Sequence, residues 1–292
     1  MTEPVERYLT HLAAERRLSS HTVENYRRDL ESLTALAQDA ALQTLDSERI
    51  RHFIARLHGQ GLSAKSLARR LSAWRGFYRF ACKRLGFASN PCTDLRAPKV
   101  RRALPAVLSP DACAQLLDRI PEDSLEIRDK AMFELFYSSG LRLAELAGLD
   151  LAALDLSAGE ASVTGKGSKT RIVPVGSKAQ EALGTWLGVR REMAKVEEMA
   201  VFVSRNGGRL TNRQIALRLG RWAKKSGLPV HVHPHMLRHS FATHVLQSSG
   251  DLRAVQELLG HANISTTQVY THLDFQHLAK AYDTAHPRAK RK

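Results

Sequence analysis

The sequence predicts two folded domains. An all-helical domain of residues 1–97 is followed by a linker at 98–107 and a mostly helical, mixed α/β domain at 108–292. Three observations predict this division. Apolar residues recur at helical spacing through the first 88 residues without strand-like alternation, four prolines then interrupt residues 89–110, and a glycine-flanked turn later joins two short alternating segments. A chain of 292 residues is long enough to bury two cores.

Four helices are expected in the first domain. Val5, Tyr8, Leu9 and Leu12 begin the pattern, and Ser19–Ser20 supply good N-cap residues for the second helix. The third and fourth helices are expected at about 47–59 and 63–85. The fourth has a basic stripe opposite its apolar face, a pattern typical of a DNA-binding helix but also of a solvated one. That stripe consists of Lys65, Arg69, Arg70, Arg75 and Arg79.

The second domain opens at Ser109-Pro110-Asp111, which combines a cap, a proline at the first helical position and an acidic first turn. Its one β feature is a hairpin of Glu160–Thr164 and Thr170–Val175, because a Gly-Lys-Gly-Ser-Lys turn separates two short strand-like segments. Helices are expected at 110–120, 125–138, 142–148, 177–194, 211–226, 234–248, 251–259 and 265–270. A last amphipathic segment, Phe275–Tyr282, has Phe275, Leu278 and Tyr282 on one face and is expected to dock on a neighbouring protomer.

The charge balance favours a polyanionic partner. Lys and Arg number 44 against 29 Asp and Glu, a formal net charge of +15. Both halves of the chain contribute, with 17 cations and 10 anions in residues 1–100 and 27 and 19 in the remainder. Such a distribution is typical of nucleic-acid binding through phosphate neutralisation. No apolar run is long enough for a membrane span and the N-terminus lacks a basic signal region, so a cytoplasmic location is expected.

Several common motifs are excluded. No Gly-x-Gly-x-x-Gly follows a strand, and the stretch from Gly159 to Lys166 misses the phosphate-loop spacing. His235 and His239 are four apart, as zinc ligands are, but Met236 stands where a zinc protease has Glu and no third ligand is spaced nearby. A metal site is therefore not predicted.

A more informative pattern is His235-Met-Leu-Arg238, which would bring an imidazole and a guanidinium to one helix face. It is preceded by Arg142 in Gly-Leu-Arg-Leu-Ala-Glu and by Lys166 in the hairpin turn, and it is followed by Gly260-His261 and by Tyr270. This ordered set resembles the tyrosine recombinase (phage integrase) family over essentially the whole chain. The resemblance implies that residues 1–97 form a SAM-like, core-binding helical bundle and that residues 108–292 form the catalytic domain. The residues after Tyr270 resemble the branch that resolves chromosome dimers. Ala144, where the family usually has Ser, is a departure that we expect to alter a helix-face contact more than the chemistry.

The resemblance implies a catalytic set and a mechanism. Tyr270 would be the nucleophile that forms a 3′-phosphotyrosine, and Arg142 and Arg238 would bind the phosphate oxygens, which their planar forks fit. Lys166 would protonate the departing 5′ oxygen; Lys169 and Arg171 are near it, but the family register favours Lys166. His235 would accept the tyrosyl proton or orient Tyr270, and His261 would hydrogen-bond the phosphate. Which acid or base role belongs to which histidine stays open.

The resemblance further implies double-stranded DNA with a specific site as substrate, no cofactor and no metal. It also implies a tetrameric synapse with a second recombinase and control by a DNA translocase. Three alternatives remain at this point: an integrase of a mobile element, a type IB topoisomerase, and a non-catalytic architectural protein on the same fold. The recognition sequence and the base-reading residues cannot be assigned from the pattern.

Overall fold

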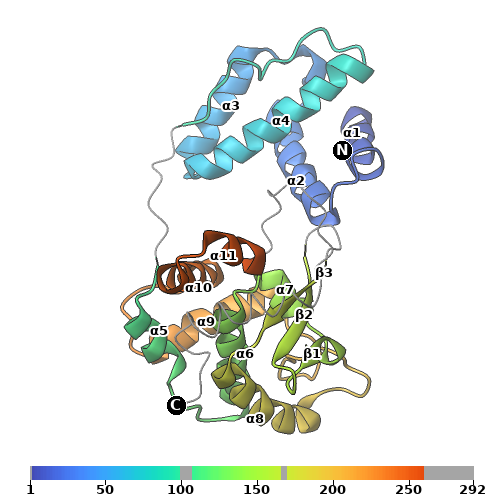
Figure 1. Ribbon diagram of the computed structural model, residues 1–292. Coiled ribbons are helices and arrows are strands. Elements are labelled where there is room, and N and C mark those ends of the chain that lie inside the picture. Colours follow the sequence, from blue (N-terminus) through green and yellow to red (C-terminus); the bar gives the residue numbers. More distant parts are fainter. Residues whose placement is uncertain (1, 99–106, 166–169, 260–292) are drawn as a thin grey trace. The chain divides into compact units, whose positions relative to one another are not determined.

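The computed structural model describes residues 2–98, 107–165 and 170–259 (Figure 1). The chain divides into two compact units, Met1–Ala103 and Leu104–Lys292, each with its own apolar core. The described part of the chain is mostly helical, with one small sheet. The predicted fold class is therefore confirmed.

The first unit is a helical bundle. Its elements are α1 (Glu3–Ala14), α2 (Ser20–Ala37), the 3₁₀ turn η1 (Leu42–Thr44), α3 (Ser47–Gly59) and α4 (Ala64–Arg84). Ser19, Asp46 and Ser63 cap α2, α3 and α4 with side-chain oxygens that accept backbone N–H groups three residues later. These caps explain why the helices begin where the sequence predicts.

The longest helix of this unit, α4, organises the bundle. Trp74 is fully buried, and its indole N–H donates to the carbonyl oxygen of Asp29 on α2 at 2.7 Å. Part of the predicted basic stripe serves the fold: Arg69 and Arg70 flank the buried carboxylate of Asp29, and Arg75 donates to backbone carbonyls in residues 92–95. Lys65, Arg69 and Arg79 are the exposed residues of the stripe, and of these Arg69 is already paired with Asp29.

The second unit surrounds one buried helix with further helices and a sheet. Its helices are α5 (Pro110–Leu117), α6 (Ser124–Ser139), α7 (Leu143–Gly148), the 3₁₀ turn η2 (Leu151–Ala153), α8 (Ser177–Met193), α9 (Asn212–Lys225), α10 (Pro234–Ser249) and α11 (Leu252–Leu259). The antiparallel sheet has the order β1 (Leu154–Asp155), β2 (Glu160–Thr164), β3 (Thr170–Pro174).

Helix α6 is the centre of this unit. It packs against α5, α8, α9, α10 and strand β3, and residues on all its faces are buried. Its weak amphipathicity follows from this position, because a helix covered on every side has no solvent face to keep polar. It ends at Ser139, and the left-handed backbone of Gly140 (φ +55°) turns the chain into α7. The buried helix thereby fixes the start of the segment that contains Arg142.

The structure adds detail that the sequence did not predict. The predicted hairpin is present, with Val163 opposite Arg171 and Thr164 opposite Thr170, and a short third strand, β1, pairs with β2. A two-residue strand has no periodicity to detect, which is why β1 was missed. The predicted segments 265–270 and Phe275–Tyr282 lie outside the described residues. The three free cysteines form no disulfide in the described part of the chain.

Candidate active site

Arginines from three separate elements surround a buried carboxylate, that of Glu145 on α7. Arg171 on β3 binds it in a bidentate manner, with Nη1–Oε1 and Nη2–Oε2 distances of 2.6 and 3.0 Å. Arg142 binds it through both its backbone N–H (2.7 Å) and its guanidinium (2.8 Å). Arg238 on α10 lies 4.0 Å away. The two predicted phosphate-binding arginines are therefore brought to one point.

Arg238 is anchored by backbone oxygens as well. Its guanidinium donates to the carbonyl of Gly140 at 2.5 Å and to that of Leu259 at 2.6 Å. Both carbonyls lie at helix C-termini, where backbone oxygens lack intrahelical partners and attract a cation. One side chain thereby ties the end of α6 to the end of α11, and its planar fork is held in a fixed orientation.

The electrostatics of the cluster keep Glu145 and Arg238 charged at neutral pH. Burial would raise the pKa of Glu145, but hydrogen bonds from Arg171 and from the Arg142 backbone outweigh that effect and lower the pKa to about 2. Burial, together with repulsion by Arg142, lowers the pKa of Arg238 to about 10, which still leaves it protonated at neutral pH. Three guanidiniums around one carboxylate leave an excess positive charge.

The side chains of the cluster differ in how far they are exposed to solvent. The side chains of Arg142 and Arg238 are 37% and 12% exposed, whereas those of Arg171 and Glu145 are almost fully covered. An anion from solvent can therefore reach Arg142 first, whereas Arg171 is buried and pairs with Glu145 inside the protein. Oriented guanidiniums in a partly desolvated position are suited to a phosphate whose charge increases in a transition state.

The predicted histidine lies one helical turn before Arg238. His235 is exposed in the first turn of α10, a helix that begins at Pro234 and is capped by the imidazole of His233. Burial and the neighbouring His235 and His231 lower the pKa of His233, which keeps it neutral and able to accept the Met236 N–H. Among the residues that the structure describes, no group of histidines, cysteines and acids is arranged to hold a metal.

The remaining predicted site residues lie outside the described part of the chain. These are Lys166, His261 and Tyr270. The ends of strands β2 and β3 border residue 166, and the C-terminus of α11 immediately precedes residue 260. Strand β3 is joined to α11 through Arg171, whose Nε donates to the carbonyl of Leu258 at 3.1 Å.

Sequence reasoning missed the structural importance of Arg171 and Glu145. The i,i+3 spacing of Arg142 and Glu145 is common in weak surface ion pairs, but in the structure the side chain of Glu145 is only 2% exposed. Arg171 was considered only as a possible substitute for Lys166. A usable signal was present: alternation along β3 buries Arg171 and Val173 and leaves Ile172 exposed, and a buried arginine requires a carboxylate partner.

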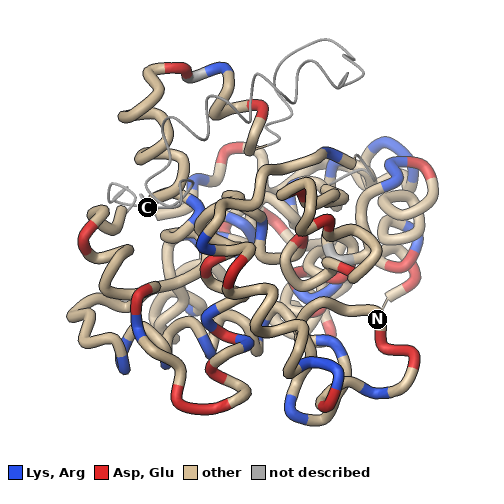
Figure 2. The backbone as a smooth tube through the Cα atoms, turned by 60° about the horizontal axis from the view of Figure 1, so that its bottom comes forward, with Lys and Arg blue, Asp and Glu red and all other residues tan. Residues whose placement is uncertain are grey.

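Cations are not confined to this cluster. Figure 2 shows Lys and Arg at many separate points along the described backbone, interspersed with Asp and Glu. The net charge of +15 is thus a property of the whole chain, and the cluster around Glu145 is distinguished by burial and order. None of the described helices is both long and apolar enough to cross a membrane.

Comparison with known proteins agrees with this architecture. Residues 106–277 match the model of the phage integrase family, and residues 5–84 match that of the phage integrase N-terminal SAM-like domain. These matches define a DNA strand transferase: the chain belongs to the phage integrase family of tyrosine recombinases, enzymes that cut and rejoin DNA.

Similarity to particular members extends over the full length. The chain is 55% identical to the tyrosine recombinase XerC of Pseudomonas aeruginosa over 296 aligned positions, covering 100% of this chain and 97% of the relative. The crystal structure of XerA recombinase is 30% identical with a TM-score of 0.52, covering 98% of this chain and 99% of that one. XerH bound to a palindromic difH substrate in a post-cleavage complex has the same fold at 24% identity, with a TM-score of 0.70 and coverage of 96% and 83%.

Proposed function

We propose that this protein recombines DNA at a specific site through a 3′-phosphotyrosine on Tyr270, and that it resolves chromosome dimers with a second recombinase of the XerD type. The observation that carries the catalytic part is the convergence of Arg142 and Arg238 on buried Glu145. Family membership and the XerC relative support the biological part. Double-stranded DNA is the substrate, as the substrate-bound XerH complex suggests by its fold.

The geometry supports a division of labour between the two arginines. Arg238 is fixed by two carbonyls and keeps one orientation, so it sets the position of a phosphate. Arg142 is more exposed and meets the incoming anion. As the tyrosyl oxygen attacks phosphorus, the charge on the non-bridging oxygens increases, and preorganised cations stabilise that state more than the ground state.

Four further residues are proposed to form the covalent bond, transfer the protons and bind the phosphate. In this proposal Tyr270 forms the O–P bond, Lys166 gives a proton to the leaving 5′ oxygen, and His235 accepts the tyrosyl proton or orients Tyr270. His261 donates a hydrogen bond to the phosphate. The diester energy is conserved in the phosphotyrosine, so a 5′ hydroxyl from another strand can reverse the step and reseal the DNA.

In the proposed resolution of chromosome dimers, two kinds of recombinase act together in one synapse. Two protomers of this chain and two of the XerD-type partner would form the tetrameric synapse, with the Phe275–Tyr282 segment docking on a neighbour. An FtsK-type DNA translocase would control the activity of the synapse. These partners follow from the similarity to XerC.

A covalent-trap assay tests the proposal. Nicked duplexes that contain a candidate recombination site are incubated with wild type and with Tyr270→Phe, with and without a purified XerD-type partner, and the adduct is mapped by peptide mass. We expect an adduct at Tyr270 in the wild type and none in the variant. Tight DNA binding without any adduct, even with the partner present, would contradict the catalytic assignment and favour an architectural role.

A further inference from the structure

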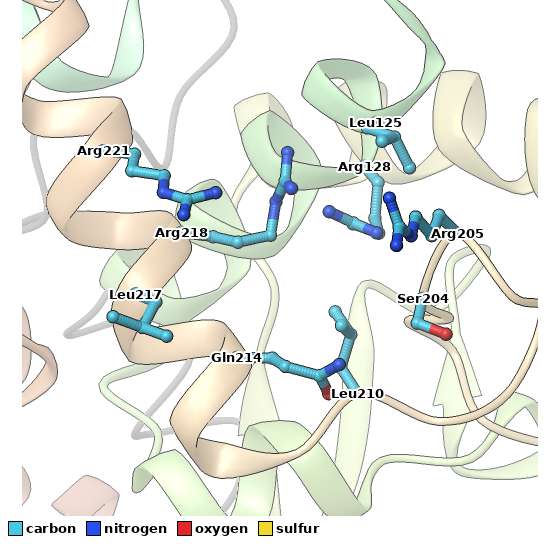
Figure 3. A pocket seen from close by; sticks show the side chains of 9 residues that line it. All are labelled: Leu125, Arg128, Ser204, Arg205, Leu210, Gln214, Leu217, Arg218 and Arg221. Carbon is cyan, nitrogen blue, oxygen red and sulfur yellow. The ribbon is translucent and has the colours of Figure 1, made fainter.

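A second basic site lies in the catalytic unit, in a pocket between α6, α9 and the loop at 204–210. The pocket encloses about 290 Å³. It is lined by Leu125, Arg128, Ser204, Arg205, Leu210, Gln214, Leu217, Arg218 and Arg221. In the view of Figure 3, the four arginine side chains lie along one side of the opening, with Leu210, Gln214 and Leu217 along the other.

The arginines of the pocket have an unbalanced charge. Arg128 is buried and donates to Asp129 Oδ1 and to the carbonyl of Val203, and Arg218 donates to the other oxygen of Asp129. The single carboxylate of Asp129 therefore accepts hydrogen bonds from two guanidiniums at the base of the pocket. Arg205 and Arg221 are exposed at its rim and add two further positive charges. The pocket is built to receive an anionic group.

Apolar side chains complete the lining. Leu125 and Leu210 are at least partly buried, whereas Leu217 is 53% exposed on the outward face of α9. An exposed leucine inside an arginine-rich concavity is suited to a ligand that combines a negative charge with a neighbouring apolar group. Ser204 and Gln214 can supply hydrogen bonds to the backbone of such a ligand.

The pocket is separate from the cluster around Glu145. Arg128 lies near the N-terminus of α6, and Gly140, whose carbonyl holds Arg238, follows the C-terminus of the same helix. At 1.5 Å of rise per residue these points are about 18 Å apart. A ligand in the pocket therefore does not occupy the phosphate site formed by Arg142 and Arg238.

We propose that this pocket binds an acidic peptide segment of a partner protein. A Glu or Asp carboxylate of the segment pairs with Arg205 and Arg221 above the fixed Arg128–Asp129–Arg218 triad, and an adjacent leucine-sized side chain packs on Leu217. The charge complementarity selects an acidic segment, and the concave, partly apolar lining selects a peptide over a duplex, whose backbone offers charge but no apolar side chain.

Fluorescence anisotropy on the full chain tests this assignment. The probes are the fluorescein-labelled peptide GLEDLEG and its uncharged counterpart GLQNLQG. We expect saturable binding of the acidic peptide only, weakened about fivefold by Arg205→Glu and by Arg221→Glu. Leu217→Ala is expected to weaken it about threefold. Arg213→Glu is the matched control, because Arg213 is also exposed on α9 but does not line the pocket, and it should change the affinity less than about twofold.

Other outcomes would overturn the proposal. Equal weakening by Arg213→Glu and Arg221→Glu would mean a general attraction to a basic surface, and absence of saturable binding by the wild type would mean that the pocket takes no acidic peptide. If a duplex without a recombination site displaced the peptide and lost affinity specifically in Arg221→Glu, the pocket would be a DNA contact. Adduct formation at Tyr270, measured on the same Arg221→Glu sample, should stay at the wild-type rate, which separates this proposal from the proposed catalysis.

Discussion

Glu145 determines whether Arg142 and Arg238, the two arginines proposed to bind phosphate, have fixed positions. Its two oxygens accept hydrogen bonds from Arg142 and Arg171, and Arg238 lies close by. Without the carboxylate, three like charges would face each other in a partly buried space. Removing one partner of a buried ion pair costs about 3–5 kcal/mol, because the remaining charge stays desolvated. The same carboxylate therefore supports both the stability of the unit and the order of the site.

The first prediction concerns the pH dependence of stability. The pKa of Glu145 is about 2 in the folded chain and higher in the unfolded chain, so its stabilisation is complete above about pH 4.5 and is lost as the pH falls toward 2. Glu145→Gln is expected to lower the free energy of unfolding by about 3 kcal/mol at pH 7, and by progressively less below pH 4.5. Urea unfolding at several pH values measures this. Glu181→Gln, at an exposed position on α8, is the control and should have little effect.

The second prediction separates charge from geometry at Arg238. Lysine keeps the positive charge but cannot donate to both Gly140 and Leu259, which the guanidinium reaches at 2.5 and 2.6 Å. We expect Arg238→Lys to slow adduct formation at Tyr270 by about 10²–10³-fold. DNA affinity should change much less, because one phosphate contact is a small part of the total. Arg253→Lys, at an exposed position on α11, should leave the rate unchanged; a comparable loss there would count against a specific role for Arg238.

At the scale of elements, the turn from α6 into α7 sets the position of Arg142. Gly140 has φ +55°, and a Cβ at this position would lie 2.3 Å from the ring of Phe241 on α10. The carbonyl of the same residue also accepts the hydrogen bond from Arg238. Backbone conformation, helix packing and the orientation of a predicted catalytic side chain therefore depend on one glycine.

The third prediction follows from that turn. Gly140→Ala is expected to lower stability by about 2–3 kcal/mol, through the left-handed backbone and the overlap with Phe241, and to reduce the rate of adduct formation. Gly148→Ala, eight residues later, is the matched control, because nothing lies within 4 Å of a Cβ there and its backbone is helical. Thermal unfolding and the covalent-trap assay measure both effects. Equal destabilisation by the two variants would contradict the assigned role of Gly140.

Local signals explain which elements could be predicted from the sequence. Helices with clear caps and amphipathic spacing, such as Ser47–Gly59 and Ala64–Arg84, follow from the sequence almost to the residue. The strand Leu154–Asp155 could not be predicted because its pairing with β2 is a tertiary contact. The same limit applies to the site. Arg142 and Arg238 were identified through a family pattern, whereas the hydrogen bond between Arg171 and Glu145 joins residues 26 apart that no local rule connects.

At the scale of the whole molecule, each of the two units has its own apolar core. The unit of residues 1–103 has a contiguous apolar interior that includes Leu30, Ile50, Trp74 and Phe77, all of which are nearly inaccessible to solvent. Among residues 2–98, which the structure describes in this unit, the ion pairs and side-chain caps also have both partners inside the unit. A segment with its own core and its own polar contacts meets the conditions for independent folding.

The last prediction is that residues 1–103 fold alone. Trp74 is the only tryptophan in this segment, and it is buried with its indole N–H bonded to Asp29, so its fluorescence reports directly on the core. We expect blue-shifted emission and a single cooperative urea transition in the isolated segment. Asp29→Asn should lower its midpoint, since Arg69 and Arg70 would lose the buried carboxylate, whereas Asp39→Asn, at an exposed position, should not. Red-shifted emission in the isolated segment would mean that the first core requires the second unit, and that the chain folds as one cooperative body.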